Sequence, residues 1–215
     1  MENKTLKINE IFTSIQGEGI QSGLPTIFIR LTGCNLRCNW CDTKYAYNKG
    51  RDKNLINILK EIKKFKIKNI CITGGEPLLQ KNLLLFIRLL IEEKYKILIE
   101  TNGSLDVSLI PKEVLISLDI KCPSSNESKK NLLSNLKFLK KKDQCKFVIN
   151  DYKDYLYAKR IIKKYNLIKK INIFFTPVGG KNARNLVEWI LKDKLNIRIG
   201  LQIHKIIWGD KKRGV

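Results

Sequence analysis

The feature that most constrains the fold of this chain is a regular alternation of short β-branched runs with segments whose apolar residues recur at helical spacing. We predict strands at residues 26–31, 70–73, 96–100, 114–119, 146–149, 171–176 and 197–201. We predict helices at residues 55–65, 82–93, 129–141, 155–165 and 183–191, the first capped by Asn54. Strands that alternate with helices indicate a parallel sheet with helices outside it. We therefore predict an α/β fold, an open, partial β/α barrel of about six parallel strands.

Length and composition favour one enzyme domain spanning residues 1–215. The chain has 215 residues, of which 43% are hydrophobic, and it shows no linker or internal repeat. It contains no run of eighteen apolar residues, and its N-terminus does not resemble an export signal, so we expect a cytoplasmic protein without a membrane partner. In that compartment the six cysteines indicate metal ligands and buried thiols, with Cys71 and Cys145 among the latter.

The formal net charge of +22 raises the possibility of a nucleic-acid partner. The basic residues are spread over amphipathic helices, where they fit a solvated face, and an AT-rich coding sequence would itself enrich lysine. We therefore expect no direct contact with nucleic acid. A zinc-stabilised nucleic-acid-binding module remains the alternative that is not an enzyme.

Three cysteines lie within eight residues, at Cys34, Cys38 and Cys41. Their C-x3-C-x2-C spacing supplies three thiolates to a cubane iron-sulfur cluster, which normally takes four, so that one iron is left open to bind a small molecule. The alternative is a zinc site. It would need a fourth ligand from Cys122, another distant cysteine or the single histidine, His204.

Polar residues follow the predicted strands, where active sites of parallel sheets form. The turn Gly74-Gly75-Glu76-Pro77 allows close approach of a ligand to its backbone, and Glu76 or its neighbours could pair with an ammonium group. Upstream, Gln16 and Glu18 could read the edge of a heterocycle, and Arg30 could clamp a carboxylate. The alternative for these residues is a solvated loop and a surface arginine.

The cysteine loop and the Gly-Gly-Glu-Pro turn resemble those of the radical S-adenosylmethionine (SAM) enzymes. More closely, residues 8–43, 74–77, 100–103, 119–121 and 201–205 resemble the 7-carboxy-7-deazaguanine synthase (QueE) family of queuosine biosynthesis. This resemblance implies that 6-carboxy-5,6,7,8-tetrahydropterin becomes 7-carboxy-7-deazaguanine with loss of ammonia. A 5′-deoxyadenosyl radical takes hydrogen from C6 and later returns it, so SAM acts catalytically. An enzyme that installs a glycyl radical on a protein partner is the rival enzymatic interpretation.

The resemblance, with the residue chemistry above, assigns the site. The [4Fe-4S] cluster would be held by Cys34, Cys38 and Cys41, and Mg²⁺ by Thr43. SAM would contact Trp40, Cys41, Asp42, Gly74, Gly75, Glu76, Gly103, Cys122, Pro123 and Ser124, with Cys122 acting only through main-chain atoms. Substrate would contact Ile15, Gln16, Gly17, Glu18, Arg30, Thr101, His204 and the terminal carboxylate of Val215. His204 could equally be a structural histidine. We further expect an external, flavodoxin-like electron donor and a homodimer.

Overall fold

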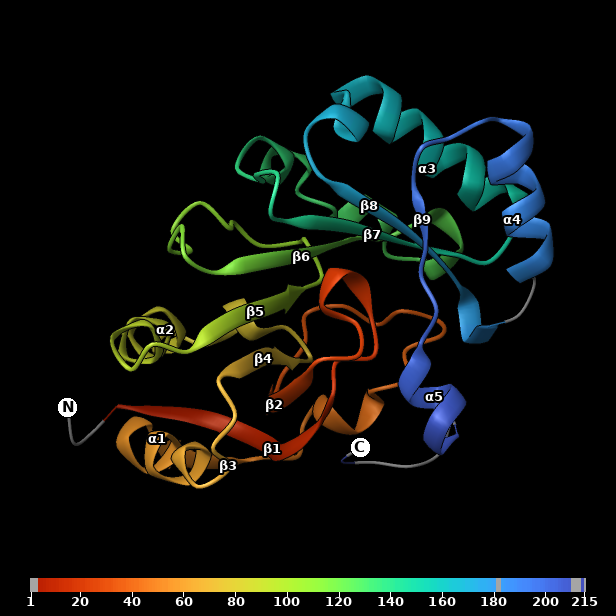
Figure 1. Cartoon of the computed structure of the whole chain (residues 1–215). Coiled ribbons are helices and arrows are strands. Elements are labelled where there is room, and N and C mark those ends of the chain that lie inside the picture. Colours follow the sequence, from red (N-terminus) through yellow and green to blue (C-terminus); the bar gives the residue numbers. More distant parts are fainter. Residues whose placement is uncertain (1–3, 181–182, 210–213, 215) are drawn as a thin grey trace.

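A computed structural model describes residues 4–180, 183–209 and 214. Within them one nine-stranded sheet has the order β3-β1-β2-β4-β5-β6-β7-β8-β9 (Figure 1). Its strands are β1 (Thr5–Ile15), β2 (Pro25–Leu31), β3 (Arg51–Asn54), β4 (Asn69–Gly74), β5 (Lys96–Thr101), β6 (Leu115–Ile120), β7 (Gln144–Ile149), β8 (Asn172–Pro177) and β9 (Arg198–Ile199). The neighbouring strands β2, β4, β5, β6, β7, β8 and β9 pair in parallel. Strand β1 pairs antiparallel with both β2 and β3. The sheet is open, with β3 and β9 at its edges.

Helices lie around the outside of the curved sheet, except for α5, which lies apart from the others (Figure 1). They are α1 (Leu55–Lys63), α2 (Leu83–Glu92), α3 (Tyr152–Tyr165), α4 (Ala183–Lys192) and α5 (Ile203–Trp208). Asn54 caps α1 as expected, because its side-chain oxygen accepts a hydrogen bond from the Ile56 N–H at 2.8 Å. Asp151 caps α3 through the N–H of Asp154, and Asn166 ends that helix in a left-handed conformation.

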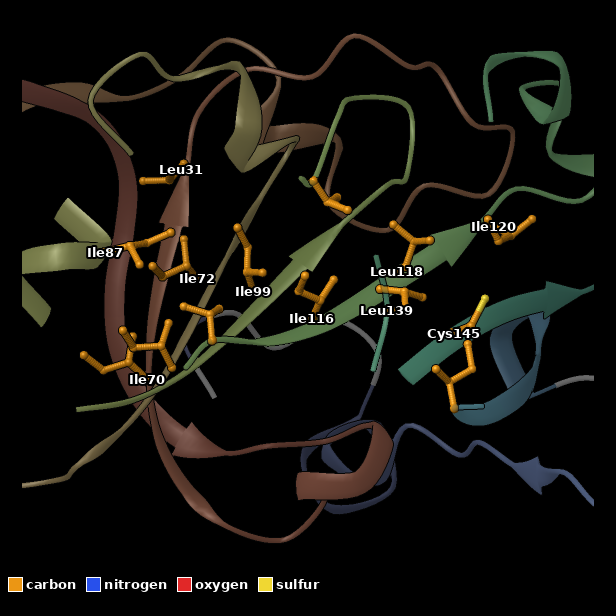
Figure 2. Packing of buried hydrophobic residues seen from close by; sticks show 14 of the residues in the cluster. Leu31, Ile70, Ile72, Ile87, Ile99, Ile116, Leu118, Ile120, Leu139 and Cys145 are labelled. Carbon is orange, nitrogen blue, oxygen red and sulfur yellow. The ribbon is translucent and has the colours of Figure 1, made fainter. Parts of the chain in front are cut away.

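The hydrophobic core lies between the sheet and these outer helices (Figure 2). Alternate residues of the parallel strands supply it, including Ile70 and Ile72 of β4 and Ile99 of β5. The residues between them point to the inner face, where Cys71 and Leu98 form a small second cluster with Phe28. The inner face therefore carries a separate set of side chains, and the site is built on them.

Most of the predicted strands are confirmed, although β9 keeps only two residues of the predicted 197–201. Strands β1 and β3 and the helix α5 were not predicted. The prediction of an α-helix at 129–141 is wrong, since this segment forms two 3-10 turns, at Ser128–Lys130 and Leu133–Lys137. The cause is Asn135, a fully buried side chain that donates to the Leu105 carbonyl and accepts from the Val107 N–H. These long-range bonds outweigh the helical repeat.

Cys71 and Cys145 are fully buried, as predicted, and all six cysteines are free thiols. No helix of the described residues is long and apolar enough to cross a membrane.

Candidate active site

A cavity of about 670 Å³ opens at the carboxyl ends of the parallel strands. Its wall brings together most of the predicted site residues: Ile15, Gln16, Gly17, Glu18, Arg30, Cys34, Cys38, Trp40, Cys41, Asp42, Thr43, Gly74, Gly75, Thr101 and His204. These residues come from separate segments spread between Ile15 and His204. The volume lies within the range that accommodates cofactors and small substrates, roughly 300–1,000 Å³.

Five predicted residues do not line this cavity: Glu76, Gly103, Cys122, Pro123 and Ser124. Val215 lies outside the described residues. Glu76 is fully buried and accepts hydrogen bonds from the Thr101 hydroxyl at 2.9 Å and the Asn102 N–H at 2.7 Å. Burial raises the pKa of this carboxyl, against those hydrogen bonds. In this structure Glu76 positions the loop that follows β5, and its contact with SAM stays a prediction.

The turn that begins at Cys122 supports the cysteine loop from behind. Cys122 itself is buried, and the Ser124 N–H donates to Asp154 at 3.0 Å. The Asn39 side chain then donates to the Ser124 carbonyl at 2.9 Å, and the Arg37 N–H donates to Glu127 at 2.6 Å. The turn therefore holds the cysteine loop without lining the cavity.

The cysteine loop and the glycine turn form one packed unit. The N–H groups of Gly75 and Glu76 donate to the carbonyls of Leu31, at 3.2 Å, and Gly33, at 2.7 Å. A Cβ atom at position 75 would lie only 2.1 Å from the Gly33 oxygen and 2.7 Å from the Cys34 Cβ. Glycine is required here because the two backbones approach so closely.

The three loop thiols all face the cavity and are half-buried. Among the residues that the structure describes, no three Cys, His, Asp or Glu side chains converge on a point that could hold a single metal ion. A cubane cluster does not need three side chains to converge on one point, because each thiolate binds its own iron at a separate corner. Three thiols on one loop fit the three protein-held corners of such a cluster, and Cys71, Cys122 and Cys145 do not line the cavity.

The inner face of the sheet adds polar and charged residues to which the sequence assigned no ligand. Alternation places Thr73, Glu100, Asp119 and Lys146 on the cavity wall, beside the predicted Arg30. Each is a polar residue at an inward-facing position of a strand whose central residues are mostly apolar. That interruption is the sequence signal that could have identified them.

Lys146 is the centre of this charged group. Its ammonium lies 2.9 Å from a Glu18 oxygen and 3.8 Å from Asp119, which also pairs with Lys121 at 2.9 Å. Burial alone would lower the pKa of Lys146, but the carboxylates of Glu18, Asp119 and Glu100 outweigh it and hold the pKa well above its ordinary value. Burial would likewise raise the pKa of Glu18, yet Lys146 lowers it. Glu18 is thus an ionised hydrogen-bond acceptor at one end of the cavity.

Helix α5 closes the cavity against the two N-terminal loops. The Ile203 N–H donates to the Gly17 carbonyl at 3.1 Å, and Lys205 pairs with Asp42 at 3.2 Å. His204 lies so close to Gly17 that a Cβ there would meet its Nδ1 at 1.9 Å. Burial lowers the pKa of His204, so its imidazole is neutral near pH 7.

Comparison with known proteins gives consistent results. The profile of the Radical SAM superfamily matches residues 28–192. The chain is 39% identical to a protein of Koribacter versatilis named 7-carboxy-7-deazaguanine synthase, over 98% of this chain and 100% of that protein. It is 42% identical to the Clostridium acetobutylicum protein of the same name, over 97% and 99%. Among solved structures, QueE from Escherichia coli superposes with a TM-score of 0.79 at 24% identity, covering 92% of this chain and 94% of that one.

Proposed function

The chain belongs to the radical SAM superfamily and, within it, to the 7-carboxy-7-deazaguanine synthase family, and we propose on that basis how its cavity performs the reaction. The substrate is 6-carboxy-5,6,7,8-tetrahydropterin, which contracts to 7-carboxy-7-deazaguanine with loss of ammonia. The proposal rests on one observation. The three thiols that could hold an iron-sulfur cluster line the same cavity as the polar side chains that could hydrogen bond to a pterin ring.

At the cluster end, Cys34, Cys38 and Cys41 would hold the [4Fe-4S] cluster, and the Trp40 and Gly75 segments would hold SAM. When bound, the cluster and SAM supply the one-electron chemistry that removes hydrogen from C6 of the pterin and returns it after rearrangement. The role of the protein is to fix the pterin beside them and to exclude water. The contacts of α5 with both N-terminal loops support that enclosure.

At the other end, Glu18 and Gln16 would read the pterin ring. Glu18 is held ionised by Lys146 and is fixed further by the Gln202 amide, which donates to it at 2.6 Å. An ionised carboxylate is a strong acceptor for the paired N–H groups of a guanidine-like edge. The side-chain nitrogen of Gln16 donates a hydrogen bond to Glu100 at 3.3 Å, so the side-chain oxygen of Gln16 points away from Glu100. That Gln16 oxygen accepts a hydrogen bond from the Glu18 N–H at 3.3 Å.

Thr43 would provide an oxygen ligand to Mg²⁺. Its hydroxyl lies 2.8 Å from the Asp42 carboxylate, so two oxygen groups stand together on the cavity wall. Magnesium prefers oxygen ligands and retains several waters, so it could complete its shell with the substrate carboxylate.

The proposal includes an external, flavodoxin-like reductant. The described residues outside the loop offer only Cys71, Cys122 and Cys145, all buried, so they supply no second cluster to store an electron. Six free thiols suit a cytoplasmic location. A homodimer is also proposed, and the apolar Ile206 and Ile207 exposed on α5 are consistent with burial against another copy.

Anaerobically reconstituted protein, supplied with reductant and SAM, tests the proposal. We expect 7-carboxy-7-deazaguanine and ammonia in equal amounts, with far less than one SAM consumed per product. Deuterium placed at C6 should appear in 5′-deoxyadenosine and in recovered SAM, and not at the carboxylated ring carbon of the product, which bears no hydrogen. Cleavage of SAM with no consumption of the pterin would contradict the proposed substrate, and colourless protein that retains zinc would contradict the enzyme.

A further inference from the structure

Arg30, which points into the cavity from β2, is held by a residue that does not itself line the cavity. Its Nε donates to a Glu10 oxygen at 2.7 Å, and Glu10 lies directly across from it on β1. The side chains of Arg30 and Glu10 are only 16% and 22% exposed. A partly buried pair of this kind has little freedom to rearrange, so Glu10 fixes the guanidinium from behind.

Two aromatic rings complete the support. The Arg30 guanidinium carbon lies 6.0 Å from the Phe12 ring centroid and 5.8 Å from that of Tyr45. The Tyr45 hydroxyl donates to the same Glu10 oxygen at 2.8 Å. Glu10 therefore ties the strand that carries Arg30 to the segment that follows the cysteine loop.

The position of Glu10 has a local cause in the chain. The register of β1 against β2 shifts between Ile8 and Glu10, which is the mark of a β-bulge. Asn9, within the bulge, donates from its side chain to the backbone carbonyls of Tyr45 and Lys49. The bulge thus fixes Tyr45 and Glu10 together.

The support leaves one edge of the guanidinium for a ligand. Glu10 takes only the Nε, and within the part of the chain that the structure describes neither Nη nitrogen of Arg30 hydrogen bonds to protein. Those two nitrogens form one of the forked edges that bind a carboxylate in a bidentate manner.

We propose that Glu10, assisted by Tyr45, is a positioning residue that makes Arg30 a fixed carboxylate clamp and so sets the preference for a pterin that carries a carboxylate. This inference rests on the proposed function for its substrate class. Glu10 acts on the substrate only through Arg30, so its effect should be confined to ligands that the clamp can hold.

The test compares binding of two ligands, 6-carboxytetrahydropterin and tetrahydropterin without the carboxylate, by anaerobic calorimetry. The wild type should prefer the carboxylated ligand. Glu10→Ala should reduce that preference about tenfold, equivalent to about 1.4 kcal/mol, with no change for the ligand that lacks the carboxylate. Glu10→Gln keeps an acceptor for the Nε and should retain most of the preference. Tyr45→Phe keeps the ring and should show a smaller loss.

Glu61→Ala is the matched control, because Glu61 lies on α1 away from the cavity and its carboxylate also forms an ion pair, with Lys53 of β3. It should leave both affinities unchanged. Equal weakening of both ligands by Glu10→Ala would mean general structural support and would overturn the inference, as would an unchanged preference. If Glu10→Ala does not fold, an unchanged preference in Tyr45→Phe overturns it. The calorimetry measures binding without turnover, so it is independent of the activity assay. A wild-type protein that prefers the carboxylated ligand but forms no product would refute the proposed reaction and leave the role of Glu10 standing.

Discussion

Substitution of Gly75 by alanine should separate the cysteine loop from the glycine turn. The new Cβ would lie 2.1 Å from the Gly33 oxygen, whereas real Cβ contacts are essentially never below 3.0 Å, so backbone must move on one side. That movement breaks the hydrogen bonds from the Gly75 and Glu76 N–H groups, each worth about 0.5–1.5 kcal/mol net. Overpacking adds about 1–3 kcal/mol. We expect the free energy of unfolding to fall by about 2–6 kcal/mol.

Urea unfolding of the metal-free protein, followed by circular dichroism, measures this loss, and iron content after reconstitution reports on the loop. The control is Gly23→Ala. Gly23 has a positive φ of 89°, and an added Cβ there would have no atom within 4 Å. Alanine at position 23 would therefore be conformationally strained without a steric clash. If Gly75→Ala costs no more than Gly23→Ala and binds iron fully, the argument from close packing is refuted.

Four further predictions concern the cavity. Replacement of any cluster cysteine, for example Cys34→Ala, should abolish SAM cleavage and reduce bound iron, and iron analysis checks both this and the zinc alternative. Lys146→Met should cost about 1–3 kcal/mol in urea unfolding because it leaves the partly buried Glu18 carboxylate without its ion-pair partner, although the Gln202 amide still donates to it, and adding Glu18→Gln should restore part of it. The pKa of Glu18 is lower in the folded protein than its ordinary value of 4.5. Ionised Glu18 therefore stabilises the folded protein above pH 4.5, and this stabilisation is lost as the pH falls through the folded-state pKa. Glu18→Gln should accordingly make the free energy of unfolding less dependent on pH on the acid side. Thr43→Val should blunt the response of turnover to Mg²⁺, while Thr43→Ser, which keeps the hydroxyl, should preserve it; an unchanged response in Thr43→Val would place the ion elsewhere.

Local pattern alone predicted the parallel strands and the cluster ligands. The strand at 70–73 and the helix after Asn54 follow from apolar periodicity and a cap, which are properties of a few consecutive residues. Cys34, Cys38 and Cys41 could be recognised because their ligand spacing is contained in one short loop. The run from Gln16 to Glu18 was assigned to the substrate site through the family resemblance, because its residues alone fit a solvated loop equally well.

Only the tertiary structure decided what depends on contacts between distant residues. The periodic segment 129–141 does not form a helix because Asn135 is drawn into the loop after β5, 30 residues away from Leu105. Lys146 meets Glu18 across 128 residues, and Glu10 meets Arg30 only because β1 is a strand with a bulge. A local pattern carries no information on which side chain will stand opposite, since that is set by strand order and register. The sequence therefore determined which chemistry the loop can support, and the sheet determined which charges surround it.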